Sequence, residues 1–114
     1  MLRIAPLFLL MSLALPTAWA APGDAAVQQA QQAYAARKSA EFERAAREVP
    51  AEHVLAPYVE FWRLLLAGRT DDARIADFLA RHPGSRMAEL LRADWLKSLG
   101  AREVWASYLA EYAR

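Results

Sequence analysis

Residues 57–68 read Pro-Tyr-Val-Glu-Phe-Trp-Arg-Leu-Leu-Leu-Ala-Gly, and this stretch indicates the fold class. Pro57 suits the first position of a helix, and Gly68 suits the position just after a helix ends. The apolar side chains between them recur at intervals of three and four residues, which is the spacing of one helical face; they are Tyr58, Phe61, Trp62, Leu65 and Leu66. The stretch therefore predicts an amphipathic helix that packs against a core.

Similar punctuation along residues 21–114 predicts five further helices. Alanine supplies 22 of these 94 residues, whereas valine, isoleucine and threonine together supply only seven, and this balance favours helix over strand. The first two helices are expected at 25–38 and 40–49, after the N-cap residues Asp24 and Ser39. The fourth lies between Thr70 and Pro83, the fifth between Ser85 and Gly100, and the sixth at 102–112.

A weak repeat of about 30 residues links the last helices. A helix–glycine–helix pattern occurs at Gly68 and again at Gly100, and residues 78–80 (Phe-Leu-Ala) resemble residues 108–110 (Tyr-Leu-Ala). The predicted fold is all-α, with antiparallel helix pairs that form the start of an α-superhelix, or solenoid. A six-helix bundle is the alternative. In the sixth helix, the residues expected to face inward are Val104, Trp105, Tyr108, Leu109 and Tyr112.

Residues 1–20 have the three parts of a secretory signal peptide. Arg3 supplies the positive charge, residues 7–15 form a nine-residue apolar segment, and residues 18–20 (Ala-Trp-Ala) form a small-x-small cleavage site. Cleavage is expected between Ala20 and Ala21, which leaves 21–114 as the folded domain. An uncleaved membrane anchor is the alternative, although Pro16 interrupts the apolar run well short of the roughly 20 residues that a spanning helix needs.

The composition excludes several classes of function. The chain has 114 residues, no cysteine and a net charge of +1, so disulfides, cysteine metal sites and thiol nucleophiles are excluded. Removal of residues 1–20 takes away Arg3 and leaves 13 basic and 13 acidic residues. A neutral domain lacks the positive field that drives nucleic-acid binding, so no nucleic-acid partner is expected.

No residue is assigned a catalytic, cofactor-binding or metal-binding role. His53 and His82 are isolated, and both are expected to be solvated loop residues rather than bases or ligands. The carboxylates of the second helix are interpreted as a solvated face shared with its arginines. Glu60 is expected to have a structural or surface role, and Asp94 to form hydrogen bonds at the edge of a helix interface.

Aromatic residues are concentrated in the second half of the chain. At helical spacing they are interpreted as core, although stacked tryptophans can also bind sugars. The packing residues named from the sequence are Pro57, Tyr58, Phe61, Trp62, Trp95, Trp105 and Tyr108.

Several motifs occur in an order that resembles a known family. These are residues 55–64 (Leu-Ala-Pro-Tyr-Val-Glu-Phe-Trp-Arg-Leu), 78–85 (Phe-Leu-Ala-Arg-His-Pro-Gly-Ser), 91–96 (Leu-Arg-Ala-Asp-Trp-Leu) and 105–112 (Trp-Ala-Ser-Tyr-Leu-Ala-Glu-Tyr). Together they resemble the N-terminal superhelical, U-shaped domain of the soluble lytic murein transglycosylases of Gram-negative bacteria. The resemblance covers residues 28–112 and implies a periplasmic protein.

The resemblance also implies what the chain lacks. Enzymes of that family cleave between N-acetylmuramic acid and N-acetylglucosamine to give 1,6-anhydro products, and a C-terminal lysozyme-like domain carries the catalytic Glu in a Glu-Ser dipeptide. None of the eight glutamates here precedes a serine. No catalytic residue is carried over, and the named packing residues are expected to serve as scaffold.

The expected function follows from this comparison. The chain ends at Arg114 while the apolar stripe of the sixth helix continues, so we expect a fragment of a longer enzyme that is inactive alone. Its partners would be peptidoglycan glycan strands, through the parent enzyme, with the membrane involved only in export. The alternative is a self-contained periplasmic helical-repeat module that binds a protein or glycan.

Overall fold

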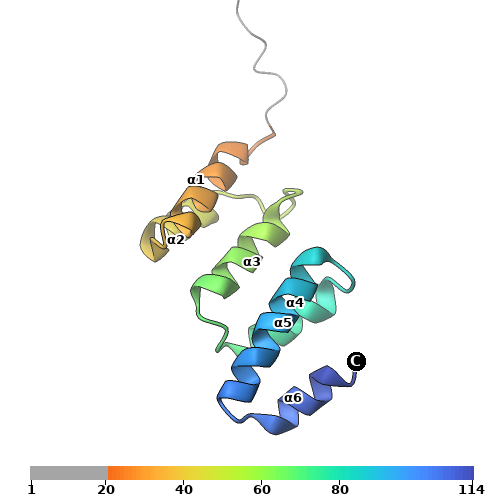
Figure 1. Ribbon diagram of the computed structural model, residues 1–114. Helices are drawn as coiled ribbons and strands as arrows, with labels where there is room; N and C mark the ends of the chain where they lie inside the picture. Colours follow the sequence, from red (N-terminus) through yellow and green to blue (C-terminus); the bar gives the residue numbers. More distant parts are fainter. Residues whose placement is uncertain (1–20) are drawn as a thin grey trace, which may run out of the picture.

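Six helices and no strand make up residues 21–114, the part of the chain that the computed structural model describes (Figure 1). The expected all-α class is confirmed. The predicted signal peptide, including Ala20, lies outside the described residues, which begin at Ala21. The helices are α1 (Asp24–Ala35), α2 (Ser39–Arg47), α3 (Ala56–Leu66), α4 (Asp72–Arg81), α5 (Arg86–Ala101) and α6 (Trp105–Tyr112).

Helix starts follow the predicted punctuation only in part. Ser85 caps α5 as expected, because its Oγ accepts a hydrogen bond from the Ala88 N–H at 3.1 Å. The expected cap Thr70 is wrong, since Asp71 caps α4 by accepting from the Arg74 N–H at 3.3 Å. Asp24 and Ser39 are the first residues of α1 and α2 rather than their caps.

The ends of α1 and α5 use non-glycine residues in the left-handed conformation. Arg37 has a φ of 56° and Glu103 a φ of 59°. After each, a backbone N–H returns to the last turn of its helix, from Lys38 to Ala33 O and from Val104 to Leu99 O, both at 2.9 Å. Because Glu103 takes this position, the expected stop at Gly100 is wrong, and α5 continues to Ala101.

Helix α3 contributes to two cores rather than one. Its most buried side chains are Val59 and Leu64, which are 4% and 3% exposed. They lie about 140° apart around the helix axis, at roughly 100° per residue. The expected single stripe is therefore wrong, and α3 lies between two groups of helices (Figure 1).

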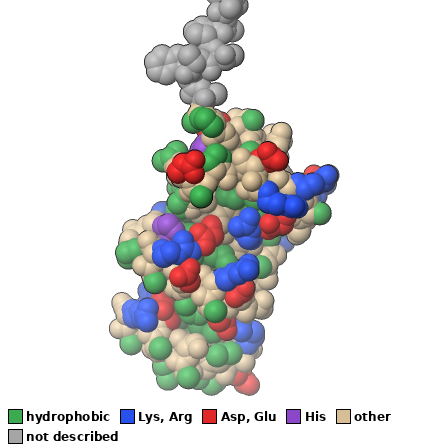
Figure 2. Space-filling view, turned by 180° about the vertical axis from the view of Figure 1, so that it is seen from behind, with side chains coloured by type: hydrophobic (Ala, Val, Ile, Leu, Met, Phe, Trp, Pro, Cys, Tyr) green, Lys and Arg blue, Asp and Glu red, His purple; other side chains and the backbone are tan. Residues whose placement is uncertain are grey.

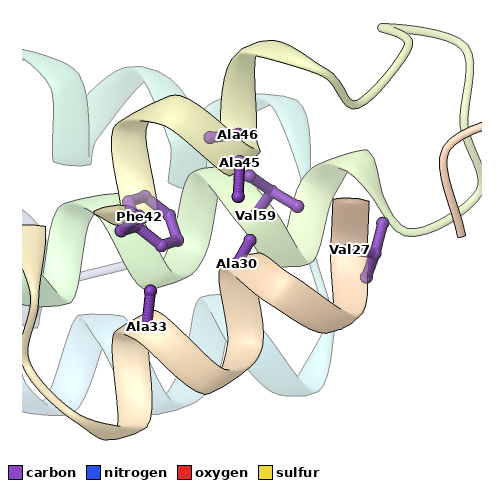
Figure 3. Close-up of a cluster of buried hydrophobic side chains, with 7 residues drawn as sticks. All are labelled: Val27, Ala30, Ala33, Phe42, Ala45, Ala46 and Val59. Atoms are coloured by element: carbon purple, nitrogen blue, oxygen red, sulfur yellow. The ribbon is translucent and has the colours of Figure 1, made fainter. Parts of the chain in front are cut away.

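The first core joins α1, α2 and one side of α3. Figure 3 shows the small side chains of α1 and α2 around the buried ring of Phe42, with Val59 reaching in from α3. Alanines let the helix backbones approach closely, which explains why an alanine-rich segment forms a core. The buried members are Val27, Ala30, Ala33, Phe42, Ala45, Ala46 and Val59.

The second core has larger side chains and joins α3, α4 and α5. Its buried members are Leu64, Ile75, Phe78, Met87, Leu91, Trp95 and Leu99.

Within the described residues, α1 contacts α3 and α3 contacts α5, while the intervening α2 and α4 each contact the helices before and after them. No helix in this part of the chain is both long and apolar enough to cross a membrane.

Helix α6 presents much of its apolar stripe to solvent. Val104 and Tyr108 pack against the second core. Trp105, Leu109 and Tyr112 are 52%, 62% and 68% exposed, so their expected inward orientation is wrong. The reason is that α6 packs through the face that carries Val104 and Tyr108, which lies one residue, or roughly 100°, around the helix from the exposed stripe. Among the described helices, α6 contacts only α5.

Replacement of Gly23 by alanine should be unusually costly. Gly23 has a φ of 94°, and a Cβ there would clash with Cδ of Pro50. We expect the free energy of unfolding to fall by roughly 2–4 kcal/mol, measured by urea denaturation with circular dichroism. Gly84→Ala is the control, because Gly84 has a φ of 72° but open space around it, and should cost about 1 kcal/mol. Equal losses would refute the Pro50 contact.

Leu64→Ala should destabilise the protein far more than the same change at Leu109. Leu64 is 3% exposed, so its truncation leaves a cavity beside α4 and α5 and should cost about 3 kcal/mol. Leu109 is 62% exposed, and its truncation should cost less than about 0.5 kcal/mol. Urea denaturation of both variants tests the placement of Leu64, and a small effect at Leu64 would contradict it.

Candidate functional site

An open groove with aromatic walls runs between α1 and residues 53–62. Its volume is about 610 Å³. The indole of Trp62 stacks on Tyr34, with ring centroids 5.9 Å apart and an interplanar angle of 18°. The ring of Tyr58 is a second neighbour of Trp62, with ring centroids 6.3 Å apart. We call this surface the aromatic groove; its lining includes Asp24, Val27, Gln28, Gln31, His53, Val54, Leu55, Tyr58 and Trp62.

The aromatic groove has the composition of a binding surface rather than of a catalytic centre. Tyr58 is 41% exposed and offers an aromatic surface, while the exposed Gln28 and Gln31 offer amide donors and acceptors. Aromatic rings beside amides suit a pyranose, which has apolar C–H faces and hydroxyl edges. The one carboxylate of the lining, Asp24, is already hydrogen-bonded.

His53 is buried, which contradicts its expected solvation. It is 8% exposed, its Nε2 lies 2.6 Å from Oδ1 of Asp24, and its Nδ1 accepts from the Leu55 N–H at 3.0 Å. This hydrogen bond holds the pKa of the Asp24 carboxyl below its usual range. His53 thus ties the start of α1 to the α2–α3 connection. The contact joins residues 29 apart, and no local sequence pattern reveals it.

Two of the acidic residues considered for catalysis, Glu43 and Glu60, are engaged by arginines. Oε1 of Glu43 accepts a hydrogen bond from Nε of Arg63 at 2.8 Å. Its arginine partner is therefore on α3, whereas the sequence predicts a partner on the same helix. Glu60 accepts two hydrogen bonds from Arg81 of α4. These pairs join neighbouring helices. Each carboxylate is therefore already engaged as a hydrogen-bond acceptor within the fold.

Asp94 and Glu111 are paired in the same way. Asp94 accepts from Arg69 at 3.2 Å, as the expected interface hydrogen bond requires. Glu111 is 8% exposed and accepts from Nε of Arg92 at 2.9 Å, while Arg92 also donates to the Glu111 backbone oxygen at 2.6 Å. The latter contacts fasten α6 to α5.

Asp72 is the centre of a further network between α4 and α5. Its Oδ1 accepts from Nε1 of Trp95 at 2.8 Å and from Nη2 of Arg102 at 2.7 Å. The hydrogen bonds from Arg102, and secondarily from Trp95, hold the pKa of Asp72 below its ordinary value, against the opposing effect of partial burial. Asp72 also raises the pKa of Arg102. The buried indole therefore has a polar partner.

The named packing residues differ in how deeply they are buried. Trp95 is buried at 4%, and Phe61, Trp62 and Tyr108 are partly buried against the cores. Tyr58 and Trp105 are exposed, and Pro57 lies at the start of α3. Sequence reasoning missed Val59 and Leu64, although a helix that is apolar on most sides signals burial on two faces.

The described residues contain no group of three side chains that could hold a metal ion. Acidic and basic side chains are interspersed over the face shown in Figure 2, without a large region of one sign. That distribution agrees with the equal numbers of acids and bases counted in residues 21–114. In comparisons with protein-family models, curated proteins and solved structures, no match to this chain was found.

The Asp72 network predicts a defined pH dependence. Because the pKa of Asp72 in the fold lies below its ordinary value of 3.8, its contribution is present above that value and is lost as pH falls through the lowered pKa. Asp72→Asn should lower the free energy of unfolding by roughly 1 kcal/mol at neutral pH. The difference from the unmodified protein should shrink below about pH 4.

Urea denaturation across pH 2–7 measures this difference. The control is Glu52→Gln, which removes an exposed acid in the α2–α3 connection and should have little effect. A difference for Asp72→Asn that stays constant down to pH 2 would contradict the assignment.

Proposed function

We propose that residues 21–114 form the first part of the superhelical scaffold of a periplasmic lytic transglycosylase. In this role the segment is non-catalytic and supports a separate domain that cleaves peptidoglycan between N-acetylmuramic acid and N-acetylglucosamine to give 1,6-anhydro products. The observation that carries the proposal is the ordered set of motifs in residues 55–64, 78–85, 91–96 and 105–112, which follow a signal-like leader.

The helix contacts support a scaffold role. Contacts of α1 with α3 and of α3 with α5 form a series that further helix pairs could extend, as in a solenoid. The exposed stripe of Trp105, Leu109 and Tyr112 on α6 is suited to contact with such a pair. A superhelical arrangement is accordingly part of the proposal.

The state of the acidic residues supports a non-catalytic role. A glycan-cleaving enzyme needs a carboxylic acid that can donate its proton in a partly apolar cleft. Glu43, Glu60, Asp72, Asp94 and Glu111 instead accept hydrogen bonds from arginines. Under the proposal, glycan strands are partners only through the parent enzyme, and the membrane takes part only in export.

The aromatic groove favours a second candidate function, a self-contained periplasmic module that binds a glycan. The accessible ring of Tyr58 and the amides of Gln28 and Gln31 lie around one open groove beside Trp62. Such a module would bind muropeptides without cleaving them.

The two candidates differ in a direct assay. Residues 21–114, incubated with purified peptidoglycan sacculi, should release no 1,6-anhydro-muropeptides by chromatography and mass spectrometry, with an active lytic transglycosylase as the positive control. The scaffold proposal also requires that the reading frame continue past Arg114 into a lysozyme-like domain with a Glu-Ser dipeptide. Release of anhydro products by residues 21–114 alone would overturn the non-catalytic role.

A genuine stop codon after Arg114 would overturn the scaffold proposal and favour the binding module. In that case soluble muropeptides should change the tryptophan fluorescence of the protein. Tyr58→Ala in the groove should weaken this binding, and Trp105→Ala on α6 is the matched aromatic control outside it.

A further inference from the structure

A closed turn brings the backbone nitrogen of Ala21 onto a carboxylate. The Ala21 nitrogen lies 2.8 Å from Oδ2 of Asp24, and the Asp24 N–H returns to the Ala21 oxygen at 3.1 Å. These reciprocal hydrogen bonds fix the Ala21 nitrogen just before α1. Pro50 lies against the intervening Gly23, where an added Cβ would clash with Cδ of Pro50.

The second oxygen of the same carboxylate is held by His53. The Leu55 N–H donates to Nδ1 of His53 at 3.0 Å, so Nδ1 is the acceptor and the ring hydrogen lies on Nε2. Nε2 then donates to Oδ1 of Asp24 at 2.6 Å. The imidazole therefore orients the carboxylate through this hydrogen bond.

Asp24 differs from the other carboxylates described above, because it has no lysine or arginine partner in the described part of the chain. Glu43, Glu60, Asp72, Asp94 and Glu111 each pair with an arginine, whereas the side-chain partner of Asp24 is His53. The lowered pKa of Asp24 agrees with a carboxylate that stays ionised. An ionised, oriented carboxylate that lies 2.8 Å from a backbone nitrogen is suited to a positive charge on that nitrogen.

We infer that Asp24, positioned by His53, is a binding site for the α-ammonium group that proteolytic processing creates at Ala21. This inference rests on the proposed cleavage between Ala20 and Ala21. A signal peptidase hydrolyses that peptide bond with one water: the hydroxyl goes to the Ala20 carbonyl carbon, and the Ala21 nitrogen becomes a primary amine. At neutral pH the amine takes up a proton, so a neutral amide donor becomes a cation at the same place.

Processing then adds a charge-assisted contact to the mature domain. The new ammonium group would join Ala21 to α1 through Asp24, and to the α2–α3 connection through His53. The site requires the chain to begin at Ala21. One extra residue before Ala21 moves the positive charge by up to about 3.8 Å, and the Ala21 nitrogen beside Asp24 then remains a neutral amide.

A thermodynamic cycle tests the inference on the mature chain. Both cores consist of residues after Ala21, so chain 21–114 contains all of their side chains. One protein begins at Ala21, released from a fusion by a protease that leaves no extra residue, and the other has one additional alanine before it. Each is prepared with Asp24 and with Asp24→Asn, and circular dichroism first establishes that each is helical and unfolds cooperatively.

The expected result is a dependence on both the N-terminus and the carboxylate. The unfolding equilibrium constant at neutral pH should be roughly threefold smaller for the chain that begins at Ala21, and Asp24→Asn should abolish this difference. The matched control is Asp71→Asn, which removes an acid at the start of α4 but preserves a capping side chain, and there the difference should persist.

The inference is overturned if the two N-termini give equal stability, or if the difference survives in Asp24→Asn. Whether cells perform the cleavage is a separate measurement. Intact mass of the protein recovered from the periplasm after expression of the full chain reports the mature N-terminus, and a start other than Ala21 would overturn the processing step without affecting the cycle.

Discussion

The packing of α3 against two cores is the constraint on which the rest of the structure depends. Val59 enters a core made largely of alanines and Phe42, and Leu64 enters a core of larger side chains around Phe78 and Trp95. Helix α3 is the helix that contributes buried side chains to both cores. A helix with apolar residues on two faces cannot be solvated on either face without exposing them, so burial of both faces fixes the positions of the helices on each side.

Ion pairs give register to these apolar contacts. Glu43 with Arg63, Glu60 with Arg81, and Arg92 with Glu111 each join two helices, and the side chains of most of these residues are partly exposed. Exposed pairs of this kind contribute little to stability, so their main effect is to favour one alignment of each helix pair over its alternatives. Contacts between helices thus account for part of the balance of acidic and basic residues in the sequence.

The sequence predicts the helices well because their signals are local: apolar spacing, alanine content and punctuation such as Ser85 and Pro83. It fails where the structure depends on distant partners. The pattern of α6 shows an apolar stripe but not which part of it a neighbour covers, and Trp105 is exposed as a result. The buried His53 is hydrogen-bonded to Asp24, which is 29 residues away in the sequence. The indole N–H of the buried Trp95 likewise finds its hydrogen-bond acceptor in the distant Asp72.

The attachment of α6 has a consequence for motion. Among the described helices it contacts only α5, through a face that includes Tyr108 and the Arg92–Glu111 contacts, whereas α3 lies between both cores. Opening α6 therefore disrupts one interface, while opening α3 disrupts the whole domain. We therefore expect hydrogen exchange to be graded along the chain, with the amides of α6 exchanging through a local opening and those of α3 only through global unfolding.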